Sequence, residues 1–213
     1  MAKTGKPAEE RAYHHGNLRR ALLDAAVALF AERGTFDFTF RELARTAGVT
    51  HNAPYRHFAG RAELLTALRE EGLSRLAELE HEALATAGDD PRARVSALGE
   101  AYVRFALAEP VVFRLVLAQP LDEEGGKANV ARGAESYRLL ERTLEEARQK
   151  GVARTDLSAK ELALAAWALV HGIASLLASG RLPTSPQRIK GYVALLSSIF
   201  IEGAASRPRN HPG

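Results

Sequence analysis

The sequence predicts an all-α protein. Apolar residues recur three and four positions apart along nearly the whole chain, and no stretch alternates with a period of two for long enough to suggest a sheet. Glycine, proline and capping residues divide this pattern into segments of helical length. With 213 residues, of which 46% are hydrophobic and 26% charged, the chain has the composition of a soluble globular protein that buries a core.

Composition also limits the chemistry. The chain contains no cysteine, which excludes thiol nucleophiles, thiolate metal sites and iron–sulfur clusters. Residues 1–66 hold ten Lys and Arg against seven Asp and Glu, so the whole formal charge of +3 lies in the first third of the chain. This distribution favours contact with a nucleic acid at the N-terminal end. The N-terminal segment lacks the apolar run of a secretory signal, and we expect a cytoplasmic protein.

The first helix is expected to end at Gly34, a typical C-terminal stop. Its apolar face is formed by Leu18, Leu22, Ala25, Ala26 and Leu29. A second, short helix follows the sequence TFRE, in which the Thr39 hydroxyl and the Glu42 carboxylate can satisfy free backbone N–H groups as a capping box.

A third short helix is expected directly after the second. Gly48 supplies the positive φ that a tight turn between two helices needs. Thr50 can then cap a helix that runs through Phe58.

From Gly60 a long fourth helix is expected to run to residue 87, where the sequence AGDDP breaks the pattern. Gly72 is the weakest point of this helix because glycine has a low helix propensity, and alanine there is expected to stiffen it. Further helices are expected at roughly 92–108, 110–118, 128–150, 158–179 and 185–204. Ser158 and Glu161 form a second capping box.

One segment resembles a membrane span in composition. Leu162–Ser179 has no formal charge and just reaches the length of a spanning helix. It contains His171, Gly172 and several alanines, and the next uncharged stretch, Gly191–Ile201, is too short to span. We therefore expect a soluble helix that packs on its own subunit and on a second one.

Two short helices joined by a tight turn and preceded by a packing helix follow the plan of a helix-turn-helix motif, whose last helix enters the major groove of DNA. Helical spacing turns Val49, Pro54 and Phe58 toward the core. The outward side chains are His51, Asn52, Tyr55 and Arg56. Asn can pair with adenine and Arg with guanine, whereas a Tyr hydroxyl suits a phosphate. The segment is a candidate DNA-reading helix, and a merely solvated polar face is the alternative.

Residues 18–65 resemble the TetR family of bacterial one-component repressors. The resemblance lies in the motifs LFAERG, TFRELARTAGV, YRHF and GRAELL, in this order and spacing. It implies a set of DNA-contacting residues on and around the third helix. These are Arg41, Thr50, His51, Asn52, Tyr55, Arg56, His57 and Arg61.

Within this set, Tyr55 and His57 match family positions that contact phosphates, and the variable positions of the helix are those that read the base sequence. Three residues depart from the family pattern. Asn52 replaces a small residue, so the base preference cannot be transferred. Pro54 replaces a leucine, and at the fourth helical position it is expected to remove only one backbone hydrogen bond. Arg61 replaces a lysine and keeps a charge for a phosphate.

The segment WALVHGIASLL resembles the WHG type of TetR C-terminal domain. Trp167 and His171 lie four residues apart and share a helix face. They can line a ligand pocket or a subunit contact. Alternatively, Trp167 is a core residue and His171 a hydrogen-bonded interior histidine, which is the interpretation we favour.

The second half of the chain is expected to bind a small molecule and to dimerise. Aromatic rings cluster in this half of the chain, and few acidic residues lie at helical positions beside them where they could attract a cation. This favours an apolar or aromatic effector. The candidate ligand-binding residues are Tyr102, Phe105, Phe113, Tyr137, Trp167 and His171. The resemblance implies that the last two long helices pair with those of a second subunit. The candidate interface residues are Leu162, Ala166, Leu169, Leu176, Leu195 and Ile199.

The expected organisation has four parts. These are a flexible basic arm (1–15), a helix-turn-helix DNA-binding domain (16–62), a helical effector-binding and dimerisation domain (63–205) and a frayed tail (206–213).

The leading hypothesis is a homodimeric repressor that binds a near-palindromic operator and leaves it when a small ligand binds. A DNA-binding adaptor without an effector is the alternative. An enzyme is disfavoured because GxSxG, HExxH, GxGxxG and P-loop patterns are missing. No cofactor or metal is expected, because His14, His15, His51 and His57 do not have the spacing of metal ligands.

Overall fold

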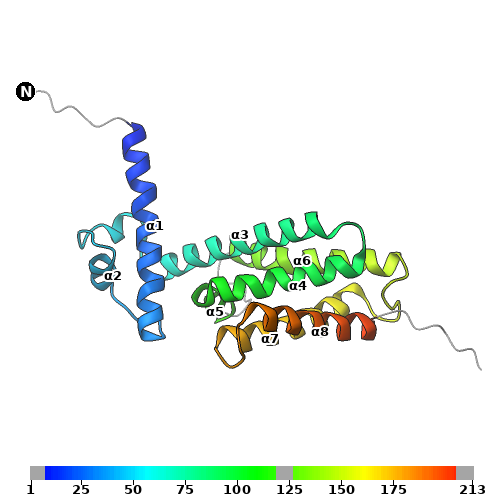
Figure 1. The fold of residues 1–213 in the computed structure, drawn as a ribbon. Coiled ribbons are helices and arrows are strands. Elements are labelled where there is room, and N and C mark those ends of the chain that lie inside the picture. The colour runs from blue at the N-terminus through cyan, green and yellow to red at the C-terminus, as the bar shows by residue number, and fades with distance from the viewer. Residues whose placement is uncertain (1–7, 119–126, 205–213) are drawn as a thin grey trace, which may run out of the picture. The chain divides into compact units, whose positions relative to one another are not determined.

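The computed structural model describes the backbone of residues 8–118 and 127–204. Within these ranges the chain forms eight α-helices, one short 3₁₀ helix and no strand (Figure 1). The elements are α1 (Ala8–Arg33), α2 (Phe40–Thr46), η1 (Pro54–Arg56), α3 (Arg61–Ala87), α4 (Pro91–Ala108), α5 (Pro110–Ala118), α6 (Lys127–Gln149), α7 (Ala159–Ala178) and α8 (Pro186–Ala204). The predicted all-α fold class is confirmed. The expected tail, residues 206–213, and the first part of the arm, residues 1–7, lie outside the described residues.

The first helix begins earlier than predicted. α1 starts at Ala8, so residues 8–15 of the expected flexible arm are helical. The sequence AEERA consists of residues that favour helices, and Glu9 and Glu10 suit the positive end of the helix dipole. The apolar periodicity begins only at Leu18 and therefore misses this part of the helix.

The chain divides into two compact units, Met1–Arg69 and Glu70–Gly213. The division falls within α3, beyond the expected boundary at residue 62. Each unit has a core of its own, so the two are described separately.

The core of the N-terminal unit joins α1, α2, the segment around η1 and the start of α3. Its fully buried side chains include Leu22, Leu23, Leu43, Phe58 and Leu64. Each such leucine contributes about 1.5–3 kcal/mol of burial free energy relative to an exposed position. The apolar face that periodicity predicts for the first helix is therefore the face that packs.

Both predicted capping boxes are present. The backbone N–H of Thr39 donates to Glu42 Oε2 at 2.8 Å, and the N–H of Glu42 donates to Thr39 Oγ1 at 3.2 Å. Ser158 and Glu161 make the same pair of bonds at the start of α7, at 2.7 and 3.2 Å. Each box satisfies backbone donors that have no partner inside the helix.

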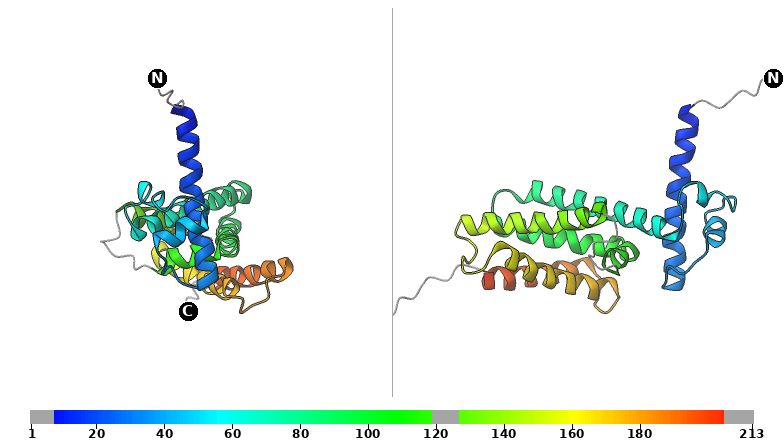
Figure 2. Two further views of the ribbon diagram at one scale, coloured as in Figure 1. Left: turned by 90° about the vertical axis from the view of Figure 1, so that its left-hand side faces the viewer. Right: turned by 180° about the vertical axis from the view of Figure 1, so that it is seen from behind.

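In the C-terminal unit, α4 contacts α5, α6, α7 and α8. The long helices α4, α6, α7 and α8 run alongside one another in all views (Figures 1 and 2). One core cluster consists of Leu144, Ala147, Ala153, Leu162 and Ala163. α4 is thus the central helix of this unit, and residues on its surface contact most of the others.

Gly72 does not have the role that we expected from helix propensity. It is buried, and a Cβ placed there would lie 2.1 Å from Cγ1 of Val112 and 3.6 Å from Cζ of Phe105. The glycine permits a close approach of α5 to α3. Alanine at this position would therefore clash with α5, which contradicts the expectation that it would simply stiffen α3.

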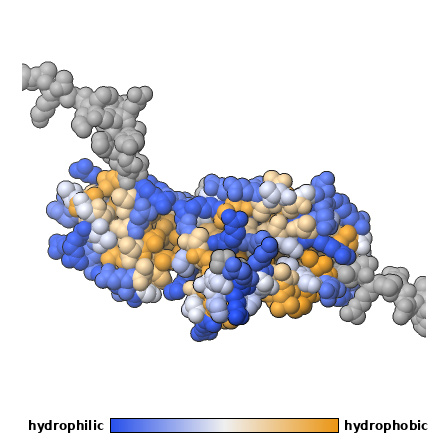
Figure 3. Space-filling view, in the orientation of Figure 1, coloured by the Kyte–Doolittle hydropathy of each residue, from blue (hydrophilic) through white to orange (hydrophobic). Residues whose placement is uncertain are grey.

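α7 is long and apolar enough to cross a membrane by length and composition alone. One side of it packs on α4, α6 and α8. The other side exposes Leu164, Leu169 and Leu176. Figure 3 shows apolar surface along the edge of this unit where α7 and α8 lie. The helix thus has one covered apolar face and one uncovered apolar face.

Candidate nucleic-acid interface

The candidate interface is built on the turn that follows α2. Gly48 has φ +68°. This left-handed conformation lets the N–H of Val49 donate to the carbonyl of Ala44 at 2.9 Å, and the N–H of Gly48 to that of Arg45 at 3.2 Å. The chain therefore reverses sharply after α2, as predicted from the position of the glycine.

The third helix is shorter than predicted. Only Pro54–Arg56 forms a helix, and it is a 3₁₀ turn. Pro54 has no N–H to donate to the carbonyl of Thr50, and its ring disfavours an α-helical turn before it. The carbonyl of Thr50 instead accepts from the N–H of Ala53 at 2.9 Å. The expectation that the proline would remove only one hydrogen bond was wrong, because its ring also changes the type of helix.

Despite this change, the division between inward and outward side chains agrees with the helical pattern. Pro54 and Phe58 are buried, and so is Ala53, whereas Val49 is half-buried. The exposed residues of the segment are Thr50, His51, Asn52, Tyr55 and Arg56. All five carry hydrogen-bond donors, which suit phosphate oxygens and base edges.

Tyr55 is 63% exposed, the highest value among the exposed large hydrophobic residues in the described part of the chain. Its ring lies on Phe40, the first residue of α2, with the ring centroids 5.0 Å apart. Arg41, the next residue of α2, is exposed. The start of α2 and the segment around η1 thus present polar groups side by side.

The other two predicted DNA-contacting residues are less open. His57 is half-buried, and its ring lies beside that of Phe58 with centroids 6.5 Å apart. Arg61 is exposed, but its guanidinium donates to Asp37 Oδ1 at 2.8 Å and to the carbonyl of Phe36 at 3.3 Å. Arg61 therefore also holds the loop before α2.

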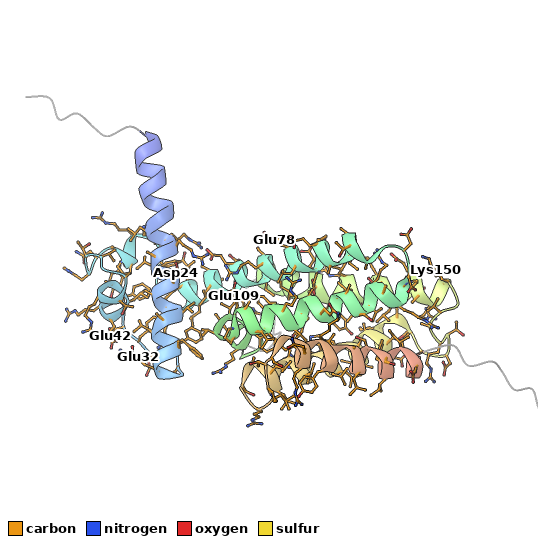
Figure 4. The ribbon with its side chains drawn as sticks, in the orientation of Figure 1. Asp24, Glu32, Glu42, Glu78, Glu109 and Lys150 are labelled. Atoms are coloured by element: carbon orange, nitrogen blue, oxygen red, sulfur yellow. The ribbon has the colours of Figure 1, made fainter. Side chains whose placement is uncertain are left out.

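An ion pair fixes α2 against the end of α1. Arg33 Nη2 donates to Glu42 Oε1 at 2.8 Å, while Glu42 Oε2 accepts from Thr39. Figure 4 labels Glu42 beside this end of α1. The hydrogen bonds from Arg33 and from Thr39 lower the pKa of the Glu42 carboxyl to about 2. The carboxylate thus stays ionised and keeps the scaffold of the exposed segment in place.

The predicted ligand-binding residues lie in the C-terminal unit and form a continuous ring cluster. Tyr102 and Phe113 meet edge to face with centroids 5.8 Å apart, and the Tyr102 hydroxyl lies 3.1 Å from His171 Nδ1. His171 stacks on Trp167 at 5.6 Å, and Trp167 meets Tyr137 at 6.3 Å. The sixth residue, Phe105, contacts Phe113 at 6.4 Å. The structure brings all six predicted residues together.

The polar groups of this ring cluster are buried to different degrees. Burial raises the pKa of the Tyr102 hydroxyl to about 12 and lowers the pKa of His171. His171 Nε2 lies 3.3 Å from the Ser175 hydroxyl. His171 is therefore a hydrogen-bonded, half-buried histidine, and Trp167 is half-buried beside it.

One buried carboxyl was missed by the sequence reasoning. Glu80 of α3 is 4% exposed, and its Oε1 accepts from the Ser136 hydroxyl of α6 at 2.5 Å. Burial raises its pKa to about 7. A signal was present in the sequence, because Glu80 lies four residues after Leu76 and four before Leu84, both of which are buried.

The predicted dimer residues fall into two groups. Leu169, Leu176, Leu195 and Ile199 are exposed, at 39–58%. Leu162 is 2% exposed and belongs to the core of its own unit, and Ala166 packs against the same cluster. The prediction of Leu162 as a contact with a second subunit was wrong because uniform hydrophobicity does not show which side of α7 faces inward. Leu164, which the sequence analysis did not include, is also exposed, at 56%.

Two family models match the chain. Residues 22–68 match the model described as "Bacterial regulatory proteins, tetR family", and residues 95–197 match "Tetracyclin repressor-like, C-terminal domain". The first match covers the helix-turn-helix segment, and the second covers most of the C-terminal unit.

Curated relatives agree with these matches. The chain is 26% identical over 210 residues to the HTH-type transcriptional regulator AcrR of Shigella flexneri, covering 93% of each protein. It is 40% identical over 82 residues to the regulator BetI of Rhizobium meliloti, which is 38% of this chain and 39% of BetI.

Solved structures show the same fold. A protein of unknown function from Rhodococcus sp. RHA1 is 38% identical, with a TM-score of 0.78, over 91% of this chain and 98% of that one. The ketosteroid transcriptional regulator KstR2 of Mycobacterium tuberculosis shares the fold at 19% identity and a TM-score of 0.69, over 89% of this chain and 95% of that one. The sequence matches, together with the helix-turn-helix geometry, show that the chain belongs to the TetR family of transcriptional regulators, which are not enzymes.

Proposed function

We propose that this protein is a cytoplasmic, homodimeric repressor that binds a near-palindromic operator and releases it when a small apolar or aromatic effector binds. The observation that carries the proposal is the donor-rich exposed segment around η1, which is held on a core of buried leucines by the Gly48 turn. Exposed donors on a rigid support are what recognition of DNA requires.

The proposed roles follow from the chemistry of each side chain. Tyr55 and His57 contact phosphates, which position the protein without reading bases. His51, Asn52 and Arg56 read base edges in the major groove, where Asn suits adenine and Arg suits guanine. Because η1 is a short 3₁₀ turn, these residues enter the groove from a compact turn.

Dimerisation doubles the contact with DNA. In the simplest arrangement, two such segments enter successive major grooves about 34–36 Å apart, on half-sites one helical turn apart. The exposed apolar side chains of α7 and α8 support a dimer contact, since their burial against a second copy removes apolar surface from water.

Release of the operator requires that the effector bind the released conformation more tightly than the DNA-competent one. A ligand that binds the DNA-competent and the released forms equally well shifts nothing, however tightly it binds. The ring cluster of the C-terminal unit supports an apolar or aromatic effector, because six aromatic or imidazole side chains from α4, α5, α6 and α7 meet there.

The test is a gel-shift titration with the DNA that flanks the protein's own gene, followed by effector screening through thermal shift. We expect specific binding to a near-palindromic site, and loss of binding on addition of a compound that raises the melting temperature. An operator complex that no stabilising compound weakens would favour the adaptor without an effector. Turnover of a compound would contradict the regulatory function.

A further inference from the structure

The C-terminal unit holds a buried carboxylate with an unused oxygen. Glu80 Oε1 accepts from Ser136, but within the described part of the chain Glu80 Oε2 is buried and has no hydrogen-bond partner. Nor does any described Lys or Arg side chain form an ion pair with Glu80. A buried carboxylate oxygen without a donor or cation is costly, so few folds retain one without a use.

Glu80 is linked to the ring cluster through α6. Its carboxylate accepts from Ser136, and the next residue of α6, Tyr137, meets Trp167 edge to face with the ring centroids 6.3 Å apart. Tyr102 contacts Phe113 and His171, and His171 stacks on Trp167. α6 therefore connects one buried acid to a set of ring faces and edges, and an acid combined with aromatic rings attracts an organic cation.

We propose that Glu80 is a binding residue for the effector and that the effector carries a protonated amino group. The N–H of the ammonium donates to Glu80 Oε2, and the apolar body of the molecule lies against the rings of Tyr102, Phe113 and Trp167. This inference rests on the proposed effector function and narrows it to amine-bearing apolar molecules. It also replaces the expectation that few acids would face the rings.

The chain contains a built-in reporter for this site. Trp167 is the only tryptophan in the sequence and lies in the ring cluster, so its fluorescence reports on this cluster alone. Suitable probes are n-octylamine and phenethylamine, each with the alcohol and the carboxylate of the same skeleton. Within each series only the charge and the donor change.

For the full-length wild type we expect the amine to bind roughly tenfold or more tightly than the alcohol, and the carboxylate to bind most weakly, because a charge-assisted hydrogen bond replaces an unpaired oxygen. Glu80→Gln keeps the size of the side chain and is expected to remove the preference for the amine. The matched control is Glu78→Gln, which changes an exposed glutamate of α3 that Figure 4 labels at the outer edge of the bundle. It should keep the preference.

The pH dependence gives a second readout. The pKa of Glu80 is about 7, so the carboxyl becomes protonated as the pH falls below that value while the amines stay charged. We expect affinity for the amine to fall between about pH 8 and pH 6 in the wild type and to be flat in Glu80→Gln. The titratable groups that act on Glu80 are His81 of α3 and Glu135 of α6. The titratable groups of the ring cluster, Tyr102, Tyr137 and His171, are unchanged in that variant.

Ser136→Ala separates binding from a structural role. It removes the hydrogen bond to Oε1 but keeps the charge of Glu80, so this variant should still prefer the amine, whether or not Glu80→Gln folds.

Three results would overturn the inference. These are equal affinity of the wild type for amine and alcohol, no binding of either amine, and an undiminished preference for the amine in Glu80→Gln. Titration of the operator complex with each compound distinguishes failure of the amine site from failure of the proposed function. Release of the operator by neutral compounds alone would support the proposed function and contradict the amine site. Glu80-dependent amine binding without release would leave the site standing without the function.

Discussion

At the scale of single residues, the exposed segment around η1 contains two kinds of proposed DNA contact: contacts to phosphates, which position the protein, and contacts to bases, which read the sequence. Tyr55→Phe and His57→Ala are expected to weaken DNA binding by roughly 3- to 10-fold on specific and non-specific DNA alike, because each loses about one hydrogen bond to a phosphate. Asn52→Ala should instead lower discrimination between bases by about 1–3 kcal/mol. Fluorescence anisotropy with an operator and its single-base variants measures both quantities. A change of base preference in Tyr55→Phe at unaltered affinity would contradict these roles.

Glu42 gives the N-terminal unit a pH-dependent stability. Its pKa is about 2 in the folded state and about 4.3 in an unfolded chain, so its contribution is fully present above the unfolded value and is lost as the pH falls toward 2. We expect Glu42→Gln to lower the melting temperature at pH 7 and to flatten the loss of stability between about pH 5 and pH 2 in this unit. Thermal denaturation followed by circular dichroism across this range is the measurement. If the variant loses stability between about pH 5 and pH 2 as steeply as the wild type, Glu42 is not the source of that loss.

At the scale of elements, local signals predicted the fold well, and signals that depend on packing did not. The capping boxes at Thr39 and Ser158 form as expected because their partners lie three residues away in the same helix. The third helix was overestimated because Pro54 changes the hydrogen-bond pattern on both sides of it. Leu162 could not be placed correctly from periodicity, since α7 carries apolar residues on more than one side. Glu80 was missed although its spacing from the buried Leu76 and Leu84 places it on the buried side of α3.

Gly72 is an element-scale feature because it sets the distance between α3 and α5. Gly72→Ala is expected to destabilise the protein by about 1–3 kcal/mol, since Val112 is β-branched and cannot rotate away freely. Val112→Ala makes room, so the double variant should cost less than the two single changes added together. The free energies of unfolding of the wild type, the two single variants and the double variant, measured by urea denaturation, test this. A stabilised Gly72→Ala would show that helix propensity outweighs the contact.

At the scale of the whole molecule, the two units divide the proposed work. The exposed polar side chains around η1 could be predicted because the motif of the N-terminal unit fixes their positions by short-range spacing. The ring cluster was also predicted in full, but its acid was not, because α3 brings Glu80 to α6 from 56 residues away along the chain. The exposed apolar side of α7 was predicted only in part, since it depends on how α4, α6 and α8 cover the other side.

The uncovered side of α7 and α8 leads to the last prediction. Leu195→Arg and Leu176→Arg each place a charge among exposed apolar side chains, and we expect either to convert a dimer into a monomer at micromolar concentration, because burying an unpaired charge costs several kcal/mol. Gln149→Arg, at an exposed position on α6, is the matched control. Analytical ultracentrifugation measures the state. Because two linked half-site contacts act at a high effective concentration, the monomeric variants should also lose roughly 100-fold or more in operator affinity. A wild type that sediments as a monomer and still binds the full operator tightly would contradict a dimer contact on this surface.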